Sequence, residues 1–336
     1  MTTVAMQPDA TAEFDVLASG LLFYDLVFSS LPDAGPQPGR EIWTSDFGHG
    51  PGGIANFAIT CARLGLSTTL AASIGDDRFG ALCLLDLERE GIDLSRSAVH
   101  PNWPTPVTAA LGYKGDRALV TAGGKPPIGG DELLAKGLPR ARAAILHIGA
   151  EEPSWLAEAA SQGCKVFADV GWDPTGRWDP SILDQLRHCH AFVPNEVEAM
   201  HYTGTKTAKD AARRLSERTT LTVVTRGGDG VIGIDAGTGE YAEIPALRID
   251  PVDTTGAGDI FGAALIFARL RVERLDDQLR FAVLVAGLAV ALPGGAATAP
   301  HPVDLLAWYS QTKDPAYAFL PGVLADTHPI ATITAR

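Results

Sequence analysis

Residues 253–259 read Asp253-Thr254-Thr255-Gly256-Ala257-Gly258-Asp259, and an apolar run over residues 260–268 follows directly. The small residues Gly256, Ala257 and Gly258 allow successive backbone amides to turn toward one point. The apolar run predicts a buried helix, whose positive N-terminal end would face the same point. The stretch therefore predicts an anion-binding turn at the start of a core helix.

The carboxylate of Asp259 stands at the mouth of this predicted turn. A carboxylate beside a bound anion is unfavourable unless it must accept a proton there. We therefore interpret Asp259 as a general base, with the amides of Gly256, Ala257 and Gly258 stabilising charge on a transferring phosphate. For the turn taken alone, a helix N-terminus that binds nothing is the alternative.

A second glycine-rich motif, Gly52-Gly53-Ile54-Ala55-Asn56-Phe57-Ala58, lies about two hundred residues earlier. The two motifs, in this order, resemble those of the PfkB or ribokinase-like carbohydrate kinases, whose C-terminal signature is Asp-Thr-x-Gly-Ala-Gly-Asp. The resemblance covers about residues 14–305. It implies a three-layer α/β/α sandwich with a mostly parallel central sheet and a small β-sheet lid. It also implies ATP-dependent phosphorylation of a hydroxyl group on a sugar or sugar-derived substrate.

The order of apolar segments independently favours an α/β fold. Strands predicted over 144–148, 165–169, 191–193 and 221–225 are separated by helices predicted over 154–161, 181–186, 195–201 and 208–217. Such alternation implies right-handed crossovers and a parallel sheet covered on both faces. Two β-like excursions, about 22–50 and 105–123, fit the lid, which would exclude water from the transfer site. We also expect one strand over 68–74, and helices over 79–89 and 275–292.

Four residues are predicted to bind the acceptor substrate. Asp25 follows the first predicted strand, and the resemblance implies that it hydrogen-bonds sugar hydroxyls. Gly52 and Gly53 would open a helix and allow a ligand close to the backbone, while Asn56 offers a donor and an acceptor. A turn-forming role for Asp25, and capping and packing roles for the other three residues, are the alternatives.

The segment Asn195-Glu196-Val197-Glu198 matches the family's Asn-x-x-Glu motif. A spacing of three places Asn195 and Glu198 on one helix face, where both can reach the same metal-bound water. Mg²⁺ prefers oxygen ligands and keeps several waters, so this would be an indirect magnesium site. A helix N-cap with an acidic first turn is the alternative.

The remaining cofactor contacts follow from the resemblance. Thr225, Gly227 and Gly230 would lie along the ATP nucleotide. A simple β-turn between two strands, which would have a similar sequence, is the alternative. The loop over 293–297 lies near adenine in relatives. Its carbonyls, with those around Asp253 and Thr255, would hold K⁺ as a further cation.

Two features leave the substrate class open. The segment 169–178 lacks the Asn that sugar-kinase branches carry there, and its Arg177 would either clamp an anionic group or be solvated. A nucleoside kinase on the same scaffold is one competitor, with an apolar lining from Phe23, Trp43 or Trp103. A non-catalytic sugar- or nucleotide-binding protein is the other, but an intact Asp259 argues against it, because a binder needs no base.

Composition sets outer limits on function. The 336 residues carry a formal net charge of −13, which argues against nucleic acid as a partner. Four widely spaced cysteines without a CxxC pair favour reduced thiols. With no signal peptide or membrane span recognised, we expect a cytoplasmic protein without a membrane partner.

The chain divides into three predicted segments. A kinase domain should span 14–312 and form a homodimer through the lid. Residues 1–13 should be a disordered tail, and 313–336 should be a C-terminal extension without a recognisable motif. No GxxxxGK[ST] loop is present, the Gly256-x-Gly258 spacing does not fit a dinucleotide fingerprint, and His188-Cys189-His190 lacks further metal ligands in sequence.

Overall fold

The computed structural model describes residues 11–32, 35–113, 116–171, 173, 175–325 and 327. Its central sheet has eight strands in the order β14-β13-β12-β11-β10-β9-β1-β4. The six strands from β12 to β4 run parallel, and β13 and β14 complete the sheet as antiparallel strands. Their bounds are β1 Phe14–Ser19, β4 Thr68–Ala71, β9 Ala141–Ile148, β10 Lys165–Val170, β11 Ala191–Phe192, β12 Leu221–Thr225, β13 Val231–Asp235 and β14 Glu240–Ile244.

Helices cover both faces of this sheet, because successive strand residues point to opposite sides. Val16 and Ile145 belong to a hydrophobic cluster that includes residues of α1, α7 and α8, whereas Leu17 and Leu146 belong to one built with α4, α5 and α6. The helices are α1 Ile54–Arg63, α2 Arg78–Arg89, α3 Gly130–Leu134, α4 Ser154–Ser161, α5 Glu196–Thr203, α6 Ala208–Leu215, α7 Ala257–Arg269, α8 Leu275–Ala289, α9 Pro302–Thr312 and α10 Leu320–Leu324. Short 3₁₀ segments are η1 Pro180–His188, η2 Gly227–Asp229, η3 Gly295–Thr298 and η4 Pro315–Tyr317.

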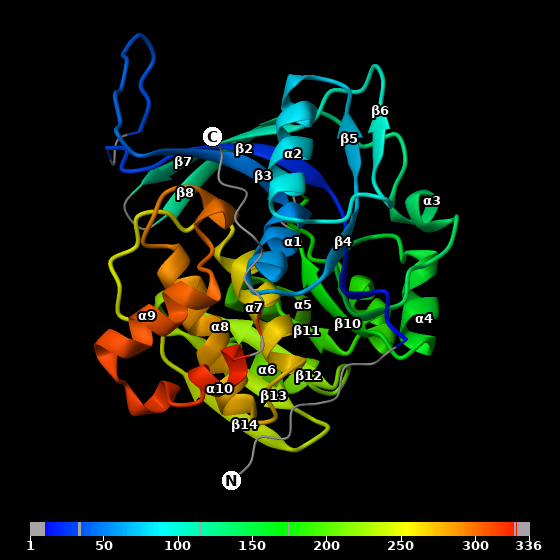
Figure 1. The fold of residues 1–336 in the computed structure, drawn as a ribbon, viewed down its shortest axis with the longest axis vertical. Coiled ribbons are helices and arrows are strands. Elements are labelled where there is room, and N and C mark those ends of the chain that lie inside the picture. The colour runs from blue at the N-terminus through cyan, green and yellow to red at the C-terminus, as the bar shows by residue number, and fades with distance from the viewer. Residues whose placement is uncertain are drawn as a thin grey trace.

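A second sheet of four strands lies apart from the first, across one end of the molecule (Figure 1). Its order is β3-β2-β7-β8, with β2 parallel to β7 and antiparallel to β3. The bounds are β2 Leu22–Phe28, β3 Phe47–Gly53, β7 Val107–Tyr113 and β8 Asp116–Ala122, and a separate pair comprises β5 Ser73–Gly75 and β6 Ala98–His100. The expected fold class, an α/β sandwich with an additional small sheet, is confirmed.

Three local expectations need correction. The single strand expected over 68–74 is two strands, because β4 joins the central sheet and β5 pairs with β6. Gly52 lies in strand β3 and does not open the helix, whereas Gly53 ends the strand and is also the N-cap residue of α1, which begins at Ile54. The helix expected to reach residue 292 ends at Ala289.

The chain ends contribute in different ways. Residues 1–10 of the predicted disordered tail lie outside the described residues, and the amide of Glu13 donates to the carbonyl of Arg140 at 2.8 Å. After residue 313, η4 and α10 bury Tyr317, Leu320 and Leu324 in the core cluster of α7 and α8. This part of the C-terminal extension therefore stabilises the fold. No helix in the described part of the chain is long and apolar enough to cross a membrane.

Candidate active site

Asp259 lies in the first turn of α7, with its side chain held by a helix from the other glycine-rich motif. The Asn56 side chain, 4% exposed on α1, donates from Nδ2 to Asp259 Oδ2 at 2.7 Å. Gly256 precedes α7 with φ 70°, and no side chain caps this N-terminus. A positive φ favours glycine, and uncapped helical amides can bind an anion. The two sequence motifs, 203 residues apart at Asn56 and Asp259, therefore meet at one point.

The turn before α7 has its own hydrogen bonds. The Ala257 amide donates to the Thr254 carbonyl at 3.2 Å, so an anion at the turn would compete for this donor. The same carbonyl and the Thr254 hydroxyl each accept from Arg117 Nη1 at 3.2 Å. Arg117 belongs to β8 of the small sheet, so it brings a positive charge to the predicted anion site. Sequence reasoning missed this residue, because an exposed strand arginine has no motif.

Asp253 joins this turn to the loop before η3. Its Oδ1 accepts from the Thr255 amide at 2.8 Å, and its Oδ2 accepts from the amides of Gly294 at 2.9 Å and Gly295 at 3.2 Å. Asp253 and Thr255 are 7% and 9% exposed. The Asp253 side chain is thus a structural clamp, and any K⁺ contact would come from backbone carbonyls.

The predicted acceptor-binding residues surround the start of the small sheet. In the β2–β3 pair, a Cβ placed on Gly52 would lie 1.9 Å from Asp25 Oδ2, so only glycine leaves room for this carboxylate. Gly53 has φ 61°, and a Cβ there would lie 2.5 Å from the Leu21 carbonyl oxygen. Burial, together with the charge of Asp259, raises the pKa of Asp25 to about 7. Asp25 and Asp259 are therefore electrostatic neighbours.

Four of the predicted magnesium and nucleotide residues, Asn195, Glu198, Thr225 and Gly227, line a separate pocket of about 310 Å³. Glu198 Oε2 accepts from the Asn195 amide at 2.9 Å, and Asn195 Oδ1 accepts from the Glu198 amide at 3.0 Å. This capping box occupies one carboxylate oxygen and leaves the other for a cation or its water. Burial raises the pKa of Glu198 to about 7. The pocket is lined by Trp178, Asn195, Glu196, Val197, Glu198, Thr225, Arg226 and Gly227.

Gly230 has a structural reason for being glycine. Its φ is 87°, and a Cβ there would lie 2.0 Å from the Ile244 carbonyl oxygen. The residue permits the close turn between β12 and β13, and it is absent from the residues lining the pocket along α5. Trp178, by contrast, forms part of that pocket, and sequence reasoning had not assigned it there.

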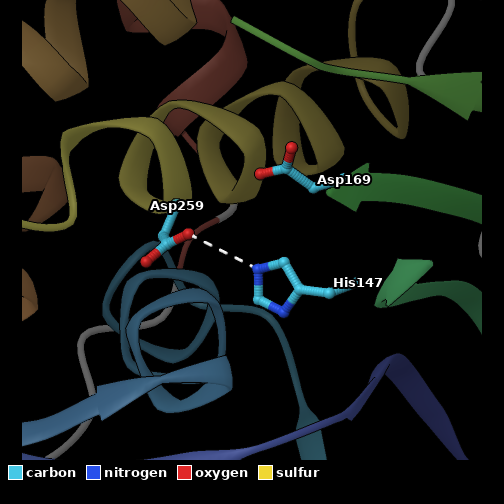
Figure 2. Close-up of side chains that lie close together, drawn as sticks. All are labelled: His147, Asp169 and Asp259. Carbon is cyan, nitrogen blue, oxygen red and sulfur yellow. Dashed lines mark ion pairs between the residues drawn. The ribbon is translucent and has the colours of Figure 1, made fainter. Parts of the chain in front are cut away.

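Next to Asp259 lies a cluster that sequence reasoning missed. His147 on β9 points toward Asp259 and Asp169 (Figure 2), and its Nε2 is 3.8 Å from Asp259 Oδ1. One nitrogen or oxygen atom from each of the three residues lies within 4.8 Å of the other two. The signal was faint, because a lone histidine near a strand end is common in protein cores.

A large cleft of about 1350 Å³ opens beside Asp259 and His147. Gly53 also lines it, as do the aromatic rings of Phe23 and Trp103. Arg177 reaches the same cleft, with Nε 3.4 Å from the Thr175 hydroxyl. Trp43 is 86% exposed and is absent from this lining. Fold and geometry thus place the Asp259 carboxylate between the uncapped N-terminus of α7 and a large cleft.

The comparisons with known proteins identify the family of this chain. The family model of the pfkB family carbohydrate kinases matches residues 15–302, so the chain belongs to that family of kinases. The ribokinase of Bacillus subtilis is 28% identical over 281 residues, covering 82% of this chain and 92% of the relative. Arabidopsis thaliana ribokinase, solved with ribose and ATP, has a TM-score of 0.69 and 23% identity, over 88% of this chain and 98% of that chain. A ribokinase II from E. coli, solved with ATP and Mg²⁺, has a TM-score of 0.73 and 21% identity, over 88% and 99%.

Proposed function

We propose that this carbohydrate kinase transfers the γ-phosphoryl group of ATP to a hydroxyl of a sugar or sugar-derived acceptor, with Asp259 as general base. The observation that carries the proposal is the position of Asp259. Its carboxylate is held by Asn56 at the N-terminus of α7 and faces the large cleft. A base at this point can take a proton from an acceptor while helical amides stabilise phosphoryl charge.

The reaction balances with one proton transfer. The acceptor oxygen forms a bond to the γ-phosphorus, the bond to the ADP oxygen breaks, and the hydroxyl proton passes to Asp259. Asp25 would hold an acceptor hydroxyl, Gly52 and Gly53 would let the substrate approach the backbone, and the amides of Gly256, Ala257 and Gly258 would bind the phosphoryl group.

The pocket along α5 supports ATP binding with a divalent ion. Glu198 supplies a nearly buried carboxylate oxygen, which fits the preference of Mg²⁺ for hard oxygen ligands, and Asn195 holds the carboxylate in place. Bound there through water, Mg²⁺ would neutralise charge on the ATP phosphates. Thr225 and Gly227 would contact the nucleotide, and Gly230 would support the turn. K⁺, held by carbonyls of Asp253 and Thr255, would act on the same turn.

A nucleoside acceptor is the second candidate, since Phe23 and Trp103 line the cleft and aromatic faces stack on bases. The test is release of ADP from Mg²⁺-ATP against ketoses, aldoses, sugar acids and nucleosides, with K⁺ or Na⁺. The proposal expects turnover on one sugar class, with faster turnover in K⁺. Turnover on nucleosides alone would establish the second candidate. ADP release no faster than that of Asp259→Asn, with every acceptor, would overturn both.

Exposed apolar side chains and free cysteines bear on assembly and location. Phe47 on β3 and Leu119 and Val120 on β8 are 48%, 55% and 63% exposed, which supports a homodimer formed through the small sheet. Four free cysteines, three of them buried, suit a reducing compartment such as the cytoplasm. Sedimentation of wild type against Leu119→Lys tests the dimer, since a charge at that interface should favour the monomer.

A further inference from the structure

The cluster of His147, Asp169 and Asp259 follows from the register of the central sheet. In the parallel pairing of β9 with β10, His147 stands opposite Asp169, and the N-terminal turn of α7 brings Asp259 to the same place. Both side chains from the sheet point toward Asp259 in Figure 2. The central sheet, instead of a loop, therefore fixes the position of the imidazole relative to Asp259.

Asp259 is held from two sides. Asn56 donates to its Oδ2 at 2.7 Å, while the Nε2 of His147 faces its Oδ1 at 3.8 Å. The His147 ring also packs edge-on against Phe57, with ring centroids 5.6 Å apart and an interplanar angle of 68°. Packing of this kind limits rotation of the imidazole. The charge of His147 thus acts on one defined carboxylate oxygen.

The charged groups that face His147 are the carboxylates of Asp259 from α7, Asp169 from β10 and Glu198 from α5. Burial alone would lower the pKa of His147, but its interaction with Asp259 and the charges of Asp169 and Glu198 raise it above the ordinary value. Burial also raises the pKa of Asp169 to about 8, against the lowering effect of His147. The cluster therefore stores a proton beside the base.

We propose that His147 is a positioning residue whose imidazolium, 3.8 Å from Asp259 Oδ1, holds that carboxylate oriented toward the acceptor. This inference rests on the proposed function and adds a residue to it. The imidazolium acts only through Asp259: it attracts the carboxylate oxygen that faces it, and it takes no part in the bonds that form and break.

The sign of the pH effect follows from these charges. Deprotonation of His147 removes the charge that holds the base, so it gives an alkaline limb to the kcat profile. His147→Gln should lower kcat about tenfold and abolish this limb, because glutamine carries no charge that a rise in pH can remove.

The matched control is His188→Gln. His188 Nε2 lies 3.4 Å from a carboxylate oxygen of Glu152, so the variant makes the same change beside another carboxylate. Its profile should equal that of the wild type. A merely structural role for His147 would lower activity in His147→Gln but leave the alkaline limb in place. That result, or a change in acceptor KM with an unchanged alkaline limb, would overturn the inference.

A second measurement needs no substrate, so failure of the proposed function and failure of this inference can be told apart. Carbon-13 labelling of the histidines allows the imidazoles to be titrated by NMR, with His147→Gln used to assign the resonance. The inference expects His147 to titrate above 6.5, the ordinary value for histidine, and lower in Asp259→Asn. Titration at or below 6.5, unaffected by Asp259→Asn, would overturn it, whatever the acceptor panel shows.

Discussion

At the scale of single residues, the site depends on glycines that leave room for neighbouring groups. A Cβ added to Gly52 would lie 1.9 Å from Asp25 Oδ2 and 2.3 Å from Asp25 Cγ. The Asp25 carboxylate therefore occupies the space that this atom would need. A glycine in a ligand-binding motif can thus act by admitting a neighbouring protein side chain as well as a ligand. The carboxylate and Gly52 form one unit, built from strands β2 and β3.

Gly52→Ala should therefore displace Asp25. We expect the acceptor KM to rise at least about tenfold with ATP KM unchanged, and a loss of about 1–3 kcal/mol of stability from overpacking. Steady-state kinetics and denaturant unfolding measure the two effects. Gly50→Ala is the matched control, since a Cβ at Gly50, in the same strand, meets nothing within 4 Å. Equal behaviour of the two variants would refute this role of Gly52.

At the scale of elements, the start of α7 is held in place by other parts of the chain. Asn56 of α1 binds the base, Arg117 of β8 binds Thr254, and Asp253 ties the turn to the loop before η3. The small sheet also approaches that loop closely, because a Cβ on Gly48 would lie 2.4 Å from the Gly294 Cα. Movement of the small sheet would therefore displace the turn before α7.

Asp253→Ala removes the acceptor of three nearly buried amides. Hydrogen bonds to a charged group are each worth about 1.5–3 kcal/mol, so we expect a clear fall in the melting temperature and a kcat about ten- to a hundredfold lower. The control is Asp250→Ala, which changes an exposed carboxylate three residues upstream. Wild-type kcat in Asp253→Ala would show that the clamp is not needed for transfer.

At the scale of the whole molecule, the proposed base lies at one end of α7, and an ion-pair network that stabilises the fold lies at the other end. Near its C-terminus, Arg269 Nη1 pairs at 2.7 Å with Oδ2 of Asp235, which is fully buried on β13. The Arg269 Nε donates to His190 Nε2 at 3.0 Å. This network joins α7 to the central sheet, away from the cleft.

Asp235→Asn leaves Arg269, whose side chain is 13% exposed, without its partner charge. Breaking a buried ion pair in this way costs about 3–5 kcal/mol, which chemical denaturation would measure. Because the network is remote from Asp259, kcat below the melting temperature should stay within about twofold of wild type. Unchanged stability, or a large loss of kcat at full folding, would contradict this division.

The same network predicts how stability depends on pH. Burial and the charge of Arg269 lower the pKa of His190 to about 4, whereas the unfolded chain protonates histidine near 6.5. The unfolded state therefore binds more protons between these values, so this residue makes the free energy of unfolding fall as pH drops from about 6.5 toward 4. His190→Gln should flatten that fall, as measured by urea unfolding across the range.

The sequence was most informative where function needs a local pattern. The α/β alternation and the two glycine motifs predicted the fold class. The motifs also marked Asn56 and Asp259 as site residues, and the two side chains contact each other in the structure. His147 and Arg117 could not be predicted from the sequence, because their roles depend on which strands become neighbours and on which segments pack together. The strand register that puts His147 opposite Asp169 has no local signature, and neither does the reach of Arg117 from β8 to Thr254.

The measurement that tests the central claim most directly is turnover of Asp259→Asn, with ATP binding followed by calorimetry on the same sample. The substitution keeps the size of the side chain and removes the base, so kcat should fall at least about a hundredfold while the affinity for ATP stays within about threefold. An unchanged melting temperature would show that the fold is intact. Near-normal turnover in this variant would contradict the account, because transfer would then need no proton acceptor at Asp259.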